Sequence, residues 1–198
     1  APPATNLGNG LYVSQPVLGE SPTDVALQYF KGNAAQFGVE DEAFDSYILK
    51  SSYLSQHTRV THVALQQSLN GLPVENAYAT ASVDNDGRVL TAASSFVSGL
   101  ADYQQTGTFD PNVTSAQAFA NLASALGYTV LSNPTQGSPS VGLSQLHQLS
   151  GGGVADTAVK AELRYVPTAS GVSLAWALNF TVSDNLAAYD AFVSADTG

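Results

Sequence analysis

The sequence predicts an α+β protein of two lobes, each with a helix packed on an antiparallel sheet. A helix-start signal precedes each set of alternating strands, tight-turn signals join those strands, and a Gly- and Pro-punctuated stretch separates the two sets. Helix followed by strands therefore occurs twice, as a weak internal repeat. The predicted division is an extended arm at 1–20, an N-terminal lobe at 21–100, a linker at 101–111 and a C-terminal lobe at 112–198.

The first helix begins at Ser21, which has the side chain of an N-cap residue. Pro22 suits the first helical position, and Asp24 places a carboxylate where the helix dipole favours it. The apolar face carries Val25, Tyr29 and Phe30, and Gly38 is the expected stop. A second, short helix is predicted over Glu40–Phe44.

From Asp45 onward the period of apolar residues changes to two, which predicts strands. The first includes Tyr47 to Leu54, and the second spans Arg59–Leu69. Asn70-Gly71 predicts a type I′ turn, because both of its central residues need positive φ. Pro73 then places the start of the next strand, Glu75–Val83, at an edge or a bulge. The Asp84–Gly87 turn leads into a strand over Arg88–Val97.

In the second lobe, Thr114 or Ser115 caps a helix that ends at Gly127. Its predicted apolar stripe consists of Ala116, Phe119, Leu122, Ala123 and Leu126. The Ser-, Gly- and Gln-rich stretch 131–153 predicts a loop. Strands follow at Thr157–Val166, Val172–Val182 and Ala187–Val193, joined by turns at Pro167–Gly171 and 183–185. The last strand ends as an interrupted hairpin, so we expect the natural polypeptide to continue past Gly198.

Charge and composition exclude several classes of partner. With 16 acidic and 6 basic residues, the net charge is −10, which disfavours nucleic acid and anionic membranes. The chain has no cysteine, and no apolar run reaches the length of a membrane helix. Asn112 and Asn179 begin N-glycosylation sequons, which give weak support for secretion.

Catalytic and metal-binding motifs are missing from the sequence. The three histidines, His57, His62 and His147, lack ligand spacing, and there is no HExxH, GxSxG or phosphate-binding loop. Asp84, Asp86 and Gly87 resemble a calcium loop without its final Glu, and a plain turn explains them better. Asp41, Glu42 and Asp45 fit a solvated helix end better than an acid/base pair. The residues alone predict a non-enzymatic binding or structural module with no cofactor of its own.

The stretch THVALQQSLNGLPVENAYATASVDNDGRVLTAASSFVSG closely resembles the prodomain of fungalysins, which are secreted fungal zinc metalloproteases. The resemblance is carried by Gln67–Gly71, Asn76-Ala77, Asp86-Gly87 with Val89, and Ser95-Phe96 through Gly99. In the second half, AELRYVPTASGVSLAWALNFTV and DNLAAYDAFVSADTG resemble the PepSY-like lobe that follows in that family. The Gly-rich 131–153 loop and the scarcity of basic residues depart from the family pattern.

The resemblance implies two cystatin-like lobes and a secreted propeptide. Such a propeptide assists folding of a linked zinc protease domain and covers its active-site cleft until the link is cut. The zinc and its HExxH would belong to that partner domain. We expect the end of the chain to contact the cleft, through Tyr189, Ala191, Val193, Ala195, Asp196, Thr197 and Gly198. The alternative is that these residues only complete the last hairpin.

Two other classes of function stay open at this point. A free-standing secreted module for adhesion or protein binding would be a complete chain without a protease downstream. An enzyme whose site escapes motif reading would show hydrolytic or transferase activity as an isolated chain.

Overall fold

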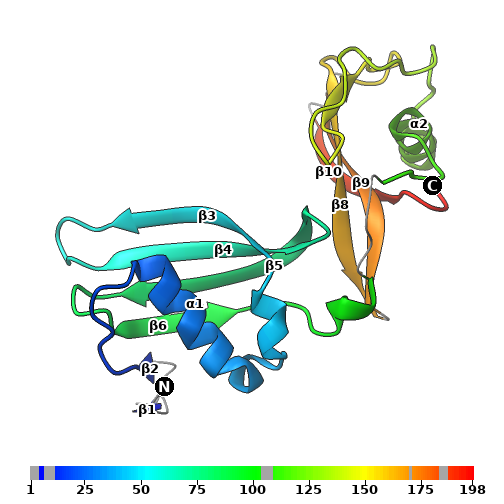
Figure 1. The fold of residues 1–198 in the computed structure, drawn as a ribbon. Helices are drawn as coiled ribbons and strands as arrows, with labels where there is room; N and C mark the ends of the chain where they lie inside the picture. Colours follow the sequence, from blue (N-terminus) through cyan, green and yellow to red (C-terminus); the bar gives the residue numbers. More distant parts are fainter. Residues whose placement is uncertain (1–4, 7–11, 104–108, 170, 183–186) are drawn as a thin grey trace. The chain divides into compact units, whose positions relative to one another are not determined.

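The computed structural model describes residues 5–6, 12–103, 109–169, 171–182 and 187–198, and it is shown in Figure 1. The chain divides into two compact units, Ala1–Gln104 (unit 1) and Gln105–Gly198 (unit 2). In the described part of each unit, an α-helix accompanies antiparallel strands. The predicted mixture of helices and antiparallel sheet is confirmed. The point of division lies within the predicted linker 101–111.

Helix α1 of unit 1 spans Pro22–Gly32 and begins as predicted. The backbone at Ser21 is extended, and its hydroxyl accepts a hydrogen bond from the Asp24 amide at 3.2 Å. The predicted stop at Gly38 is wrong for this helix. The chain leaves the α-helix at Asn33, whose amide side chain donates to the Tyr29 carbonyl at 2.8 Å and so satisfies a helix-end acceptor.

Two short 3₁₀-helices follow α1. The first, η1, spans Ala34–Phe37 and closes on Gly38, whose φ of 75° is in the left-handed region. Gly38 therefore ends the 3₁₀-helix, in the role that glycine commonly has at helix ends. The second, η2, spans Asp41–Phe44 and confirms the short helix predicted at Glu40–Phe44.

Strands β3 to β6 of unit 1 form an antiparallel meander in chain order. Their bounds are Tyr47–Leu54, Thr61–Leu69, Leu72–Val83 and Val89–Ser94. Asn70 and Gly71 have φ of 54° and 80°, as the predicted type I′ turn requires. The register between β4 and β5 shifts between Gln66 and Ser68, opposite the segment that follows Pro73. The bulge expected from that proline is therefore present.

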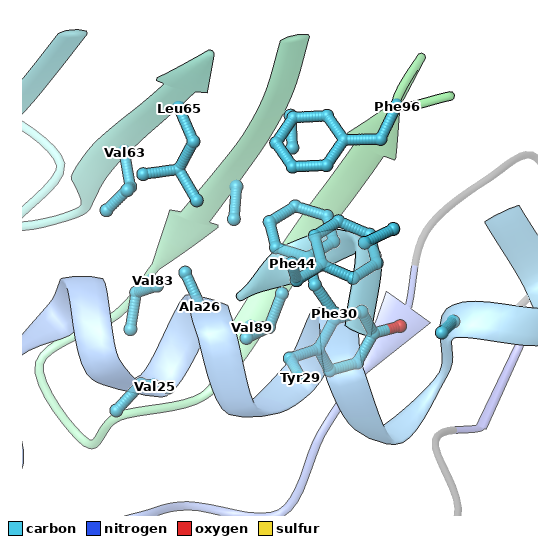
Figure 2. Close-up of a cluster of buried hydrophobic side chains, with 14 of the residues drawn as sticks. Val25, Ala26, Tyr29, Phe30, Phe44, Val63, Leu65, Val83, Val89 and Phe96 are labelled. Carbon is cyan, nitrogen blue, oxygen red and sulfur yellow. The ribbon is translucent and has the colours of Figure 1, made fainter. Parts of the chain in front are cut away.

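The core of unit 1 lies between α1 and one face of this sheet (Figure 2). Phe30, Phe44 and Phe96 form a stacked row, with ring centroids 5.2 Å and 4.9 Å apart. The sheet contributes Val63 and Leu65 from β4 and alternate small residues from β5. Burial of these side chains supplies the main stabilisation of the unit, at roughly 2 kcal/mol for each large apolar side chain.

The segment before α1 lies along strand β6. Val89 donates its amide to the Ser14 hydroxyl at 2.9 Å, and Val17 donates its amide to the Gly87 carbonyl at 3.2 Å. A Cβ atom on Gly87 would lie 2.1 Å from the Val17 carbonyl oxygen. The glycine in the Asp84–Gly87 turn thus serves both the turn, at a φ of 72°, and this close approach. Two short strands precede the segment that begins at Ser14. They are β1 at Thr5–Asn6 and β2 at Tyr12–Val13, and they pair with each other.

Helix α2 of unit 2 spans Ser115–Ala125 and is capped by Thr114. The Thr114 hydroxyl accepts from the Gln117 amide, and the Gln117 side chain accepts from the Thr114 amide, which is a capping box. Phe119 and Ala123 of the predicted stripe are buried. The stripe was wrong at Leu126, which is 40% exposed, and it missed Ala118, which is fully buried. Leu126 is the C-cap residue, just past the last helical residue Ala125, so it does not continue the buried face.

Strands β7 to β10 form the antiparallel sheet of unit 2. They span His147–Leu149, Val159–Thr168, Gly171–Val182 and Ala187–Ser194. The last three confirm the predicted strands, and the turn predicted at 183–185 lies outside the described residues. The prediction of a loop over 131–153 was wrong at β7. That strand is only three residues long and pairs with β8, so tertiary pairing and not local pattern creates it.

The core of unit 2 is centred on Trp176, which is 2% exposed. Its indole nitrogen donates to the Val113 carbonyl at 2.7 Å, just before α2 begins. Phe119 of α2 meets Phe180 of β9 edge-to-face, with ring centroids 5.1 Å apart. Trp176 is the single tryptophan of the chain, so its fluorescence reports on unit 2 alone.

Replacing Gly87 with alanine tests the contact between the N-terminal segment and β6. We expect Gly87→Ala to lower the free energy of unfolding of unit 1 by about 3 kcal/mol, because positive φ and a steric clash act together. Gly38→Ala is the matched control, since its φ is similar but no atom lies within 4 Å of the added Cβ. It should cost about 1 kcal/mol. Urea titration by far-UV circular dichroism, with Trp176 fluorescence as the report on unit 2, measures both. Equal losses in the two variants would contradict the close approach.

Candidate functional site

Gln67, in the Gln67–Gly71 segment, is turned into unit 1 and is 1% exposed. Its side-chain amide donates to the Val97 carbonyl at 2.8 Å, and its side-chain oxygen accepts from the Val97 amide at 2.7 Å. Gln67 therefore replaces a strand partner for the backbone just after β6. Regular alternation along β4 places Gln67 on the same face as the core residues Val63 and Leu65, and the extra residues at the register shift lie opposite it in β5.

Two further side chains hold the same stretch of backbone. Asn70 donates its side-chain amide to the Tyr103 carbonyl at 2.9 Å, and the Glu40 carboxylate accepts from the Gly99 amide at 2.8 Å. The segment from Val97 to the 3₁₀-helix η3 at Leu100–Tyr103 is thus fixed at three points. The side chains of Gln67, Asn70 and Glu40 are therefore engaged in holding the backbone of this stretch.

The histidines lie in three different settings. His57 lies in the turn between β3 and β4, and His62 lies on β4, where its Nδ1 is 3.1 Å from the Ser82 hydroxyl. The described residues contain no group of three or more His, Cys, Asp or Glu side chains that could hold a metal ion.

His147, noted in the sequence only as a histidine without ligand spacing, is a buried polar residue. It is 4% exposed, its Nε2 is 2.7 Å from the Ser115 hydroxyl, and its Nδ1 is 2.5 Å from the Gln145 carbonyl. The carbonyl can only accept, so Nδ1 carries the proton and Nε2 accepts from Ser115. The ring packs edge-on against Trp176. Because Ser115 is 7% exposed, this pair joins β7 to the start of α2 within the core and offers no accessible nucleophile.

The acidic clusters noted in the sequence are occupied by local partners. The Asp84 carboxylate accepts from the amides of Asp86 and Arg88, at 2.9 Å and 2.8 Å. Arg88 then forms ion pairs with both aspartates. Asp45 pairs with Lys31 of α1, while Asp41 and Glu42 lie in the first turn of η2. These contacts fit turns and helix ends.

The side chains of β10 alternate between the core and the outside. Tyr189 stacks on Phe180 at 5.1 Å and shares a 3.1 Å hydrogen bond with the Tyr128 hydroxyl, which is the main reason that the pKa of Tyr189 is raised above its ordinary 10.0. Ala191 is half-buried and Val193 is buried. Within the described residues β10 pairs only with β9, so its other backbone edge is open.

The last five residues form a turn that is fixed to unit 2. Ala195 is fully buried, donates its amide to the Leu174 carbonyl at 3.0 Å and accepts from the Val113 amide at 2.9 Å. The amides of Asp196 and Thr197 donate to the Ser194 hydroxyl. Of the seven residues expected to contact a protease cleft, only Asp196, Thr197 and Gly198 are exposed.

Each sheet also has an outer face, on the side opposite its helix. We define the open face of unit 1 by the outward positions of β3–β6. These include Ser51, Tyr53, His62, Ala64, Tyr78, Thr80, Ser82, Thr91 and Ala93. Ser51, Tyr53, His62, Thr80, Ser82 and Thr91 line a shallow hollow on it.

The open face of unit 2 is charged. It carries Lys160, Glu162 and Arg164 from β8, and Asp190 from β10. Burial of Glu162 opposes its ionisation, but the hydrogen bonds from Arg164 and the positive charges of Arg164 and Lys160 outweigh burial. They hold the pKa of the Glu162 carboxyl below its ordinary 4.5.

The two sequon asparagines are both exposed. Asn179 lies on the open face of unit 2 and donates to the Asp190 carboxylate at 2.6 Å. Asn112 lies in the loop before α2, where its side chain is 3.5 Å from the Asp196 carboxylate.

A family model accounts for the sheet of unit 1. Residues 45–96 match the Fungalysin/Thermolysin Propeptide Motif. The matched propeptide motif covers all of β3 to β6, together with the Gln67–Gly71 segment and the aromatic residue Phe96 of the core. No curated protein sequence matches the chain. Among the described residues, no helix is long and apolar enough to cross a membrane.

Replacing Gln67 with leucine tests the structural role of the motif segment. The substitution keeps the size of the side chain but leaves the Val97 amide and carbonyl without their partner, so we expect unit 1 to lose about 3 kcal/mol of unfolding free energy. Gln148→Leu, at an exposed position of β7, is the control and should change stability by less than about 0.5 kcal/mol. Urea unfolding followed by far-UV circular dichroism measures both. A neutral Gln67→Leu variant would show that the clamp contributes nothing.

Proposed function

We propose that this chain is the propeptide of a fungalysin-type secreted zinc metalloprotease, which it inhibits and helps to fold. The match of the propeptide motif to residues 45–96 carries this proposal, because those residues form the antiparallel sheet β3–β6 on which the core of unit 1 is built. The polar residues of that sheet hold its backbone in place. A segment built in this way supplies a rigid surface, and its partner supplies the chemistry.

The two units are proposed to be cystatin-like lobes, the second of the PepSY type. Their support is a shared plan, in which one helix packs on one face of an antiparallel sheet. Each has a hydrophobic core centred on aromatic side chains. Independent cores allow a propeptide to fold before or together with the domain that it assists.

Inhibition is proposed to be steric. A folded propeptide that covers the substrate cleft excludes substrate until the link is cut, without a catalytic group of its own. The zinc ion and its ligands would belong to the protease domain of the same polypeptide. The acidic charge of the chain, −10, disfavours nucleic acid and anionic membranes as alternative partners.

The end of the chain is proposed to be part of the contact with the cleft. Tyr189, Ala191, Val193 and Ala195 direct their side chains into unit 2, so their contribution would be to shape the strand. Asp196, Thr197 and Gly198 would make direct contacts, since they are exposed. The open backbone edge of β10 offers further hydrogen bonds.

We propose that the chain and its protease domain are secreted from the cell. The support is the class of protease named by the motif match, together with exposed positions for both predicted glycosylation sites, Asn112 and Asn179. A glycan on the short loop before α2 would extend into solvent without disturbing the strand pairing.

Inhibition and refolding of the protease domain test the proposed function. We expect the 198-residue chain to inhibit the mature protease domain of its own polypeptide, with tight, stoichiometric titration of peptidase activity. We also expect denatured protease domain to regain activity in higher yield when the chain is added. Bovine serum albumin at the same concentration is the control. No inhibition and equal refolding yield would refute the proposal, and a reading frame without a protease domain would favour a stand-alone binding module.

Substituting the exposed end residues tests the contact with the cleft. Deleting the last five residues would also remove the buried Ala195, so the double variant Asp196→Ala/Thr197→Ala is a cleaner experiment. We expect its inhibition constant to rise roughly tenfold, the loss of one well-placed polar contact. Asp156→Ala/Thr157→Ala changes another exposed Asp-Thr pair of unit 2 and should inhibit like the unsubstituted chain. Equal potency of all three proteins would leave the end of the chain with a structural role only.

A further inference from the structure

We infer that the open face of unit 1 is the surface that docks on the folded protease domain. This inference rests on the proposed function and adds the place of contact. The face is built by the strands β3–β6, which are the residues that match the propeptide motif. It lies opposite α1, so it is not used by the core of its own unit.

The open face of unit 1 differs in charge from the open face of unit 2. Both sheets have one face covered by a helix and one open face. The open face of unit 2 carries four charged side chains, Lys160, Glu162, Arg164 and Asp190, whereas the outward rows of unit 1 carry none. The charged residues of β3 and β5, Lys50 and Glu75, have no register partner on the neighbouring strand, because the register shifts at both positions.

Depletion of charge is the compositional mark of the centre of a protein interface. Burying a charge without a partner costs several kcal/mol, whereas a serine or threonine hydroxyl loses much less and can adapt its hydrogen bond. Unit 1 has many acidic residues, but Glu75 is the one that lies within strands β3–β6, and the others include Asp24 and Asp41 on helices and Asp84 in a turn. Its open face can therefore be covered without burying a charge of this chain.

Two exposed tyrosines provide anchors on this face. Tyr53 is 58% exposed and Tyr78 is 39% exposed. Tyr53 leans on the His62 ring, with centroids 5.1 Å apart, and His62 is held in turn by the Ser82 hydroxyl. Tyrosines held in place lose little conformational entropy when they bind, and they are frequent among the residues that dominate binding energy.

The occupant that fits this surface is a folded protein domain and not a metal ion or a second copy of the chain. The hollow between Tyr53 and Thr91 is shallow and is lined mainly by hydroxyl and ring groups, with His62 as its sole imidazole among the lining residues. Two copies would each bring a net charge of −10, and their mutual repulsion opposes self-association. A protease domain linked in the same polypeptide meets the face at high effective concentration.

A matched pair of alanine-to-glutamate variants tests the docking face. Ala93 lies on the open face of unit 1, and Ala158 lies in unit 2 just before β8, away from the end of the chain; both are exposed. We expect Ala93→Glu to raise the inhibition constant against the mature protease domain at least tenfold, because it places an unpaired carboxylate in the contact. Ala158→Glu should inhibit like the unsubstituted chain. Tyr53→Ala should weaken inhibition roughly thirtyfold, as the loss of an anchor does.

The outcomes separate this inference from the proposed function. If the unsubstituted chain does not inhibit, the proposed function fails and the inference falls with it. If the unsubstituted chain inhibits and Ala93→Glu and Tyr53→Ala inhibit equally well, the proposed function stands and the docking face is wrong. Far-UV circular dichroism and thermal unfolding check that each variant is folded. A dimer in size-exclusion chromatography that Ala93→Glu dissociates would overturn the inference by assigning the face to a second copy.

Discussion

The packing of one short helix against one face of an antiparallel sheet is the constraint on which each unit depends. Helices α1 and α2 each have 11 residues, a length of roughly 16 Å, which covers only part of a sheet of this kind. In unit 1 the remaining area is covered by the aromatic row of Phe30, Phe44 and Phe96, with η2 contributing the central ring. In unit 2 Trp176 has the corresponding role and also bonds to the backbone that leads into α2. The opposite face of each sheet is left exposed.

Polar residues complete what apolar packing leaves unsatisfied. Gln67, Asn70 and Glu40 bind backbone groups after β6 that have no strand partner there. The side chains of His147 and Ser115 bond to each other and join β7 to α2. Buried polar groups of this kind are costly unless fully paired, so their presence defines one arrangement of the chain. The polar residues of the Gln67–Gly71 segment therefore have a structural role, in which their side chains hold the backbone.

The functional proposal and the docking face follow from this arrangement. A sheet whose inward side and bulges are committed to structure has only its open face, its edges and its turns to offer to a partner. Unit 1 keeps that face free of charge and places tyrosines on it, while unit 2 presents a charged face and an end turn with three exposed residues. The two units therefore present chemically different surfaces.

The sequence by itself determined the elements whose signals are local. The cap at Ser21, the capping residue Thr114, the turn at Asn70-Gly71 and the alternation of β4, β5, β8 and β9 were all legible, because capping, positive φ and two-residue periodicity depend on neighbours along the chain. The resemblance to propeptides was legible from the same strands. Only the tertiary structure decided what depends on contacts between distant residues. Strand β7 exists through its pairing with β8, and Gln67 finds its partner in the backbone of Val97, 30 residues further along the chain. Val193 and Ala195 became core residues because α2 and the backbone at Val113 cover them, which a strand pattern cannot reveal.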